Sequence, residues 1–182
     1  PLPVPRRAPA PPFVMVTRES TQVQPEDFKR AFAHLPTAVC IVTTGPASDP
    51  GGVTVGTLSP LSLAPPLLMF TLMQDSSVLQ RLQPGMVIGI QLLSESQAEI
   101  ATRFSRRGDD RFAGLKLSHA EGAPRLEGAA AWMTALVRDR TTFGDHVLVT
   151  ALVASAEVGA GRPLLHWRRA FTGHAQDAGH RV

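Results

Sequence analysis

The sequence has 182 residues, 43% of them hydrophobic, which is enough for one domain with a substantial core and too little for two ordinary domains. Charged residues make up 18%, below the roughly 25% of an average soluble chain, while 16 prolines and 15 glycines favour turns and strands over long surface helices. The net charge of +3 is small and the ten aromatic residues mostly occupy apolar periodic positions, which argues against nucleic-acid binding, and no apolar run is long enough for a membrane helix.

The two ends of the chain differ in composition from its middle. Residues 1–22 hold six prolines and little periodicity, which predicts a disordered tail, and residues 174–182 resemble a second, shorter tail. We expect one folded domain over residues 23–173. Its first element is a helix over residues 25–35, because Pro25 suits a first helical turn, apolar residues recur at helical spacing and Pro36 ends the pattern.

Beyond this helix the pattern predicts a mainly β domain with a few peripheral helices. Short apolar runs bounded by Gly, Pro, Asp or Ser predict strands at 38–44, 53–63, 67–73, 86–93, 129–137, 146–158 and 164–167. Helical stretches are expected at 76–82 and 95–105, with Ser94 as N-cap of the second. There is no internal repeat and no βαβ rhythm, so the strands favour a barrel or sandwich over a doubly wound sheet.

Several common catalytic patterns are absent from the sequence. It contains neither G-x-G-x-x-G, nor a P-loop, nor G-x-S-x-G, and its six histidines lack metal-ligand spacing. The one cysteine, Cys40, lies between apolar residues, which favours a buried packing role. A single cysteine requires no oxidising compartment, and the N-terminus lacks the apolar core of a secretory signal, so we expect a cytoplasmic protein whose redox chemistry would need an organic cofactor.

A series of segments in fixed order carries a family resemblance that covers about residues 26–173. The segments are FKRAFAHLPTAVCIVTT, GGVTVGTLSPLSLAPPLLMFTL, DSSVLQRL, DDRFAGL, APRLEGAAAW, FGDHVLVTALV and PLLHWRRAF. Together they resemble the flavin reductase-like family, the small components that supply reduced flavin to two-component monooxygenases. The resemblance implies an FMN-binding split barrel, which is a Greek-key antiparallel β-barrel, and a homodimer with flavin near the subunit interface.

The resemblance also implies an activity, with one alternative inside the same fold. A flavin reductase transfers a hydride from NADH or NADPH to FMN or FAD, and a transient monooxygenase partner would consume the reduced flavin. The alternative is a flavin-binding carrier or electron-transfer protein, because one barrel can host both roles and fold does not fix function. A third possibility is an interaction domain that uses the Pro-rich N-terminal segment as a docking arm.

The resemblance places the flavin ring along the segment from residue 54 to residue 59. Backbone N–H groups and small side chains are expected to face the ring there, and a glycine lets a planar ring approach the backbone. The residues concerned are Thr54, Val55, Gly56, Thr57 and Ser59. Without the resemblance, the same residues describe a strand with a glycine kink and a bulge at Pro60.

Two further groups are candidates for the phosphate end of the flavin. Ser76 and Ser77 stand before a predicted helix, where they would either bind phosphate or cap the helix. Phe104 matches a flavin contact in the resembled family, but a core role is nearly as well supported. The positive patch consists of Arg103, Arg106, Arg107 and Arg111.

The D-R-F motif and the Gly-Asp-His motif complete the predicted site. Arg111 and Phe112 belong to the first, beside the cofactor in the resembled family, although Arg111 would equally serve by pairing with a carboxylate. Gly144, Asp145 and His146 form the second, which the family associates with nicotinamide dinucleotide binding. We expect the His146 imidazole to hydrogen-bond the nicotinamide or relay a proton, and Asp145 to orient it or close the turn.

Overall fold

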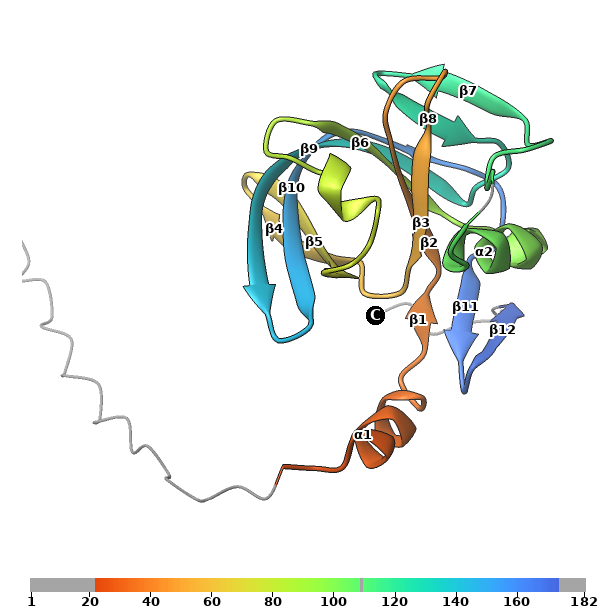
Figure 1. Cartoon of the computed structure of the whole chain (residues 1–182). Helices are drawn as coiled ribbons and strands as arrows, with labels where there is room; N and C mark the ends of the chain where they lie inside the picture. Colours follow the sequence, from red (N-terminus) through yellow and green to blue (C-terminus); the bar gives the residue numbers. More distant parts are fainter. Residues whose placement is uncertain (1–21, 109, 174–182) are drawn as a thin grey trace, which may run out of the picture. The chain divides into compact units, whose positions relative to one another are not determined.

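A computed structural model describes residues 22–108 and 110–173 (Figure 1). The expected tails, apart from residue 22, lie outside the described residues. The chain divides into one unit that ends at Phe32 and a second that begins at Ala33. The first contains helix α1 (Pro25–Phe32), in which the rings of Phe28 and Phe32 stack with centroids 4.5 Å apart. The helix ends at Phe32, three residues before the predicted boundary.

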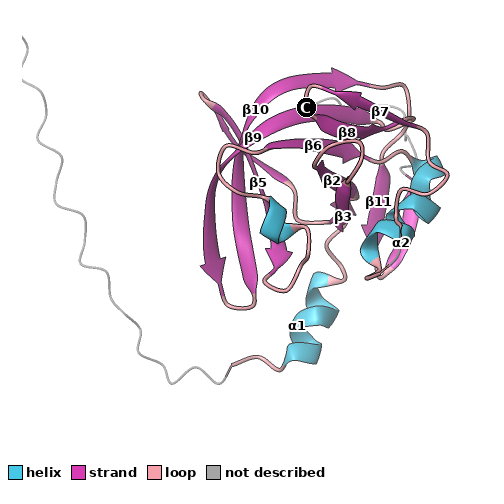
Figure 2. Ribbon diagram, turned by 45° about the horizontal axis from the view of Figure 1, so that its top comes forward, coloured by secondary structure: helices cyan, strands magenta, loops and turns pink. Residues whose placement is uncertain are grey.

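The second unit is built almost entirely from antiparallel strands, as Figure 2 shows. Its elements in chain order are β1 (Thr37–Ala38), β2 (Cys40–Thr44), β3 (Gly51–Val55), β4 (Ser59–Leu63), β5 (Pro66–Met73), the 3-10 turn η1 (Leu79–Arg81), β6 (Val87–Leu92), the 3-10 turn η2 (Glu95–Gln97), α2 (Ala98–Ser105), β7 (Leu117–Ala120), β8 (Ala123–Leu126), β9 (Ala131–Phe143), β10 (His146–Val158), β11 (Leu164–Trp167) and β12 (Ala170–Gly173). The mainly β prediction is confirmed.

Seven strands form the main sheet, in the order β3-β2-β6-β9-β10-β5-β4. Two smaller sheets accompany it, β1-β11-β12 and the β7–β8 hairpin. Figure 1 shows α2 and the β7–β8 hairpin on the side of β2 and β3, whereas β4, β5 and the β9–β10 hairpin lie on the other side. The long β9–β10 hairpin is irregular around residues 150 and 154, where shifts in register mark bulges that bend the sheet.

Several boundaries differ from the sequence-based expectation. The run 53–63 is two strands interrupted after Val55, and the run 38–44 divides at Val39 between two sheets. The helix predicted over 76–82 is wrong, because only the short turn η1 forms there. The second helix was predicted correctly in position but begins with η2, where the Ser94 backbone N–H donates to the Gln97 side chain at 3.0 Å.

Strands β7, β8 and β12 were not predicted from the sequence. Strands β7 and β8 are joined by Glu121 and Gly122, whose φ angles are 53° and 88°. Strands β11 and β12 are joined by Arg168 and Arg169, with φ angles of 50° and 65°. Only glycine adopts this left-handed region readily, so a turn made from two arginines carries none of the usual hairpin residues.

Two groups of buried side chains form the core. The first fills the barrel and includes Phe70, Ile88, Ile90 and Val149, all fully buried. The second lies between the barrel wall and α2 and includes Ile41, Leu93 and Phe104. Among the described residues no helix is long and apolar enough to cross a membrane, and no group of three or more metal-binding side chains occurs.

Candidate functional site

One cavity gathers most of the residues that the sequence singled out. It has a volume of about 580 Å³ and lies between the end of β3, the end of β5, the loop after α2 and the start of β10. We call it the main cavity. Its walls include Val53, Thr54, Val55, Gly56, Thr57, Thr71, Leu72, Met73, Asp75, Ser76, Ser77, Ser105, Arg107, Gly108, Arg111 and His146. Its volume is within the range of small-molecule and cofactor sites.

The wall formed by residues 53–57 is held in place by its own side chains. The Thr54 hydroxyl donates to the Ala101 carbonyl at 2.7 Å, which ties β3 to α2. The Thr57 hydroxyl accepts the Thr71 backbone N–H at 2.9 Å, which ties it to β5. Both hydroxyls are therefore occupied within the protein. Gly56 is exposed, and a side chain there would come no closer than 3.4 Å to a neighbour, so this wall is open to a flat ligand.

Two predicted flavin contacts lie away from this wall. Ser59 pairs with Met69 in the β4–β5 ladder and does not line the main cavity, and the bulge expected beside Pro60 is present. Phe104 is fully buried and packs against Phe112 with ring centroids 4.8 Å apart in a T-shaped arrangement. The burial of Phe104 favours the packing role, which was the alternative to flavin contact in the sequence analysis.

Ser76 and Ser77 line the main cavity in a turn. The Ser76 backbone N–H donates to the Met73 carbonyl at 3.0 Å, and the Ser76 carbonyl accepts from Leu79 at 3.1 Å. Neither hydroxyl bonds to another described residue, so both are free to bind a ligand. The expected helix dipole is absent, and phosphate binding here would have to come from hydroxyl and backbone N–H groups alone.

Arg111 and Arg107 line one end of the main cavity, which we call its arginine end. Its Nη1 donates to the Gly52 carbonyl at 2.5 Å, and its buried Nε has no partner among the described residues. The neighbouring turn is fixed by Asp110, whose carboxylate accepts the Phe112 backbone N–H at 3.0 Å. A buried guanidinium nitrogen without a partner is costly, and a bound anion would satisfy it.

The His146 side chain enters the main cavity from the β9–β10 turn, which contains Gly144 with a φ of 57°. Its Nδ1 lies 2.7 Å from the Asp145 carboxylate, an interaction that lowers the pKa of Asp145 first by the hydrogen bond and then by charge. Gln74 holds the turn against the end of β5, because its side chain donates to the Gly144 carbonyl at 2.7 Å and its backbone N–H to the Asp145 carbonyl at 3.1 Å. Asp145 thus contacts the imidazole and leaves Nε2 for a ligand.

The structure adds site residues that the sequence analysis missed. Asp75 lines the main cavity and pairs with Arg107, and Gly52 supplies the carbonyl that holds Arg111. A side-chain carbon on Gly52 would lie 2.5 Å from the Phe104 ring, so only glycine fits there. Asp75 precedes the two serines in the sequence, but its pairing spans 32 residues and no local pattern indicates it.

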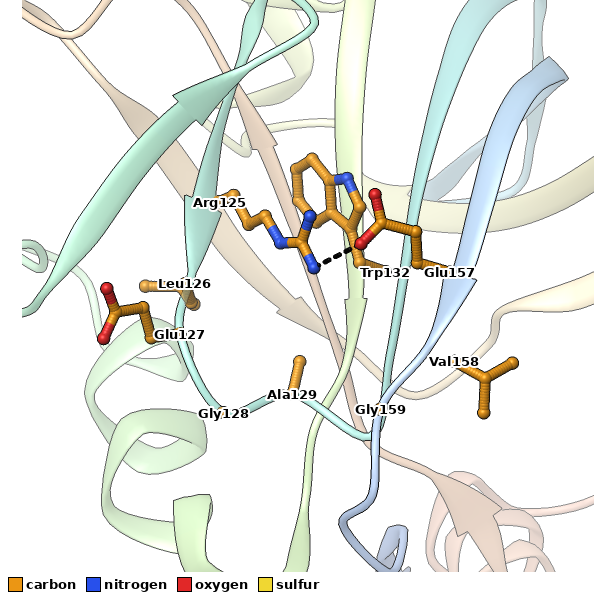
Figure 3. Close-up of a pocket in the computed structure, with 9 residues that line it drawn as sticks. All are labelled: Arg125, Leu126, Glu127, Gly128, Ala129, Trp132, Glu157, Val158 and Gly159. Atoms are coloured by element: carbon orange, nitrogen blue, oxygen red, sulfur yellow. Dashed lines mark ion pairs between the residues drawn. The ribbon is translucent and has the colours of Figure 1, made fainter.

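A second hollow, shown in Figure 3, is a structural corner. It has a volume of about 290 Å³ and lies between β8 and the paired ends of β9 and β10. The Arg125 guanidinium covers the nearly buried Trp132 ring, 5.3 Å from its centroid, and pairs with Glu157 at 2.7 Å. Its one arginine is thus already paired with a carboxylate, and none of the predicted site residues lies there.

Comparison with known proteins finds relatives over most of the chain. A family model described as "Flavin reductase like domain" matches residues 32–175. An NADH:FMN oxidoreductase from Rhodococcus erythropolis is 35% identical over 85% of both chains. The reductase component of 4-nitrophenol 4-monooxygenase/4-nitrocatechol 2-monooxygenase from Rhodococcus opacus is 32% identical over 81% of this chain and 80% of the relative.

Solved structures give the same result for the fold. The NADH:FAD oxidoreductase SgcE6 from Streptomyces globisporus, in complex with NAD and FAD fragments, superposes with a TM-score of 0.80 and 28% identity, covering 88% of this chain and all of the other. The styrene monooxygenase flavin reductase from Pseudomonas putida S12 gives 0.74 and 28%, covering 82% of this chain and 98% of that one. These matches confirm the predicted split-barrel fold.

Proposed function

The chain belongs to the flavin reductase-like domain family, and we propose that it is an oxidoreductase that transfers a hydride from NADH or NADPH to FMN or FAD. The observation that carries the proposal is the main cavity, which combines an open flat wall with an unsatisfied guanidinium nitrogen at one end and an oriented imidazole in another wall. The flavin supplies the hydride acceptor. The protein therefore needs no nucleophile of its own, and its residues bind and orient.

The residues of the main cavity suit the parts of a flavin nucleotide. Residues 54–57 offer the ring a strand edge without bulky side chains. Ser76, Ser77 and Arg111 offer hydroxyl and guanidinium donors to its phosphate. The orphan Nε of Arg111 is the observation in favour of this fit, because it is the buried donor that a bound anion would satisfy.

We assign His146 to the nicotinamide donor. Its Nδ1 is held by Asp145, so the ring is oriented before any ligand arrives. An imidazole in this position can hydrogen-bond the carboxamide or ribose of the donor, and holding the two ligands in register is worth far more to the rate than any single contact. Gly144 and Asp145 act through the turn that places the ring.

We propose that the protein works as a homodimer, because the outer face of β5 and β10 is apolar. Along both strands alternate residues enter the core, and the residues between them are only partly buried. The outward residues of this face are mostly apolar, namely Leu67, Met69, Met73, Leu148 and Leu152, with Thr71, Thr150 and His146 between them. Met73 and His146 are paired at its end and both line the main cavity, so a second copy packed on this face would also close the site.

We further propose that the reduced flavin passes to a monooxygenase partner in the cytoplasm. Related proteins are reductase components of such enzymes, including the one from Rhodococcus opacus. The buried, unpaired Cys40 requires no oxidising compartment: burial raises the pKa of its thiol to about 12, which keeps it protonated and unreactive.

The proposal is tested by mixing the purified protein with FMN or FAD and NADH or NADPH, without air and then with air. We expect anaerobic bleaching of the flavin with equimolar loss of the reduced nicotinamide, and continued consumption of the nicotinamide in air. Flavin binding without bleaching would show a carrier rather than a reductase. If the protein neither binds nor bleaches the flavin, the proposal is contradicted altogether.

A further inference from the structure

A second cavity adjoins the arginine end of the main cavity. It has a volume of about 430 Å³, we call it the arginine cavity, and the two cavities share Arg107, Gly108 and Arg111 in their walls. The described residues around it bring four guanidinium groups and two carboxylates, from Arg103, Arg106, Arg107, Arg111, Glu99 and Asp110. This excess of positive charge suits a phosphate-bearing group.

The four arginines differ in how far the fold already occupies them. Arg103 donates to the Ala113 carbonyl at 2.8 Å, and Arg107 pairs with Asp75. The Arg106 guanidinium is exposed and has no side-chain partner among the described residues. Arg106 is thus the arginine of this cavity that is available to an anion.

The direction of β3 relates the two cavities to the proposed flavin. Arg111 binds the carbonyl of Gly52 near the start of the strand, and the open wall follows at residues 54–57. A flavin whose ring lies along that wall and whose phosphate meets Arg111 therefore ends at the wall shared with the arginine cavity. A third cavity also adjoins Arg111, but its cation Arg81 is bound to the Asp49 carboxylate at 3.1 Å and serves the β2–β3 loop.

From this continuity we infer that the arginine cavity holds the AMP half of FAD, and that Arg106 makes the protein prefer FAD to FMN. This inference rests on the proposed function. FAD differs from FMN by an added adenylate, whose phosphate meets Arg106 while the adenosine occupies the remaining volume. The arginine cavity is a specificity site and takes no part in the hydride transfer.

The test measures flavin affinity directly, by fluorescence titration of FAD and FMN without any nicotinamide. The wild-type protein binds FAD at least tenfold more tightly than FMN. Arg106→Glu raises the Kd for FAD at least tenfold and changes that for FMN less than twofold. The matched control is Arg138→Glu, an exposed arginine on β9 that lines neither cavity, and it changes neither affinity. AMP displaces FAD but not FMN.

Three results would overturn the inference. Equal wild-type affinity for FAD and FMN removes the preference itself. An equal loss of both affinities in Arg106→Glu assigns the arginines to the phosphate that the two flavins share. A raised KM for NADH with unchanged FAD affinity assigns the cavity to the donor. In each case anaerobic flavin reduction still proceeds, whereas failure of the proposed function shows as no reduction with either flavin.

Discussion

The two sides of the barrel are covered differently. Strand β2 is buried along its whole length, because its inward side chains enter the barrel core and its outward ones, such as Ile41, pack under α2. Strands β5 and β10 are buried on alternate residues only, although their outward residues include Leu67, Met69 and Leu148. Within the described barrel unit, α2 covers the side of β2, whereas the outward residues of β5 and β10 stay partly exposed.

The difference in burial between the two sides bears on how the main cavity is completed. An antiparallel strand with one solvated face normally alternates apolar with polar residues, and β5 does not. Within the unit that contains β5 and β10, the outward residues of that face stay only partly buried, and the main cavity lies at its edge. We expect the covered side to contribute mainly to stability and the partly exposed side to contribute to binding.

The largest expected effect comes from the covered side. Phe104→Ala removes a fully buried ring that packs against Phe112, and should lower the free energy of unfolding by about 3–5 kcal/mol. Chemical denaturation followed by circular dichroism measures this loss. The control Leu63→Ala, at a residue that is 93% exposed on β4, should cost less than about 0.5 kcal/mol. Similar losses of unfolding free energy in the two variants would contradict the claim that the covered side contributes more to stability.

Placing a charge on the uncovered side should act on assembly rather than on folding. Leu148→Lys puts a cation opposite Thr71 in the apolar outer face. We expect light scattering to show a monomer, and flavin affinity to fall at least tenfold, about 1.4 kcal/mol. Leu63→Lys, outside this face, should remain a dimer. A dimeric Leu148→Lys with unchanged flavin affinity would show that the face has another role.

A smaller effect is expected where the uncovered side meets the donor. His146→Ala removes one hydrogen bond worth about 0.5–1.5 kcal/mol, so kcat/KM for NADH should fall between about twofold and tenfold. The Kd for flavin should change by no more than a few-fold. Steady-state kinetics and fluorescence titration measure the two quantities separately. The assignment is wrong if flavin binding suffers and the apparent NADH affinity does not.

The smallest effect concerns the β7–β8 hairpin on the covered side. The Glu121 carboxylate at its turn accepts hydrogen bonds from Ser155 and Thr134, which lower its pKa. A lowered folded-state pKa means that the ionised group stabilises the fold above the unfolded-state pKa, near 4.3, and that this contribution is lost as the pH falls through the lowered value. Glu121→Gln should therefore lower Tm slightly at pH 7. Melting curves should converge in acid, and a constant difference down to pH 3 would contradict this origin.

The sequence predicted the fold class well because strand periodicity and turn residues are local signals. The bounds of β10 agree with the prediction. Strand β5 begins one residue earlier than predicted, and β6 is one residue shorter at each end. It failed at residues 76–82, where the polar start suggested a helix but the chain turns after one 3-10 turn. The turn at Arg168 and Arg169 contains no glycine, so the sequence showed no hairpin there and β12 was not predicted.

The candidate site was predictable only in part, for a physical reason. Motif positions indicated Arg111 and His146, and both line the main cavity. Asp145, which holds the His146 ring, is its neighbour in the sequence and was predicted in that role. Gly52, which holds Arg111, and Gln74, which holds the carbonyl of Gly144, lie 59 and 70 residues from their partners, and such contacts leave no local pattern. Burial of Phe104 likewise depends on α2 packing against β3, which spacing alone does not show.

The central claim is that flavin binds to a pair of chains through the uncovered face of β5 and β10. Sedimentation velocity at the visible absorbance of flavin tests it most directly, because it gives the mass of the species that carries the flavin. The account predicts that the flavin sediments with a species of twice the 19.5 kDa chain mass, and that Leu148→Lys abolishes this boundary. Flavin sedimenting with a single chain of 19.5 kDa would contradict it.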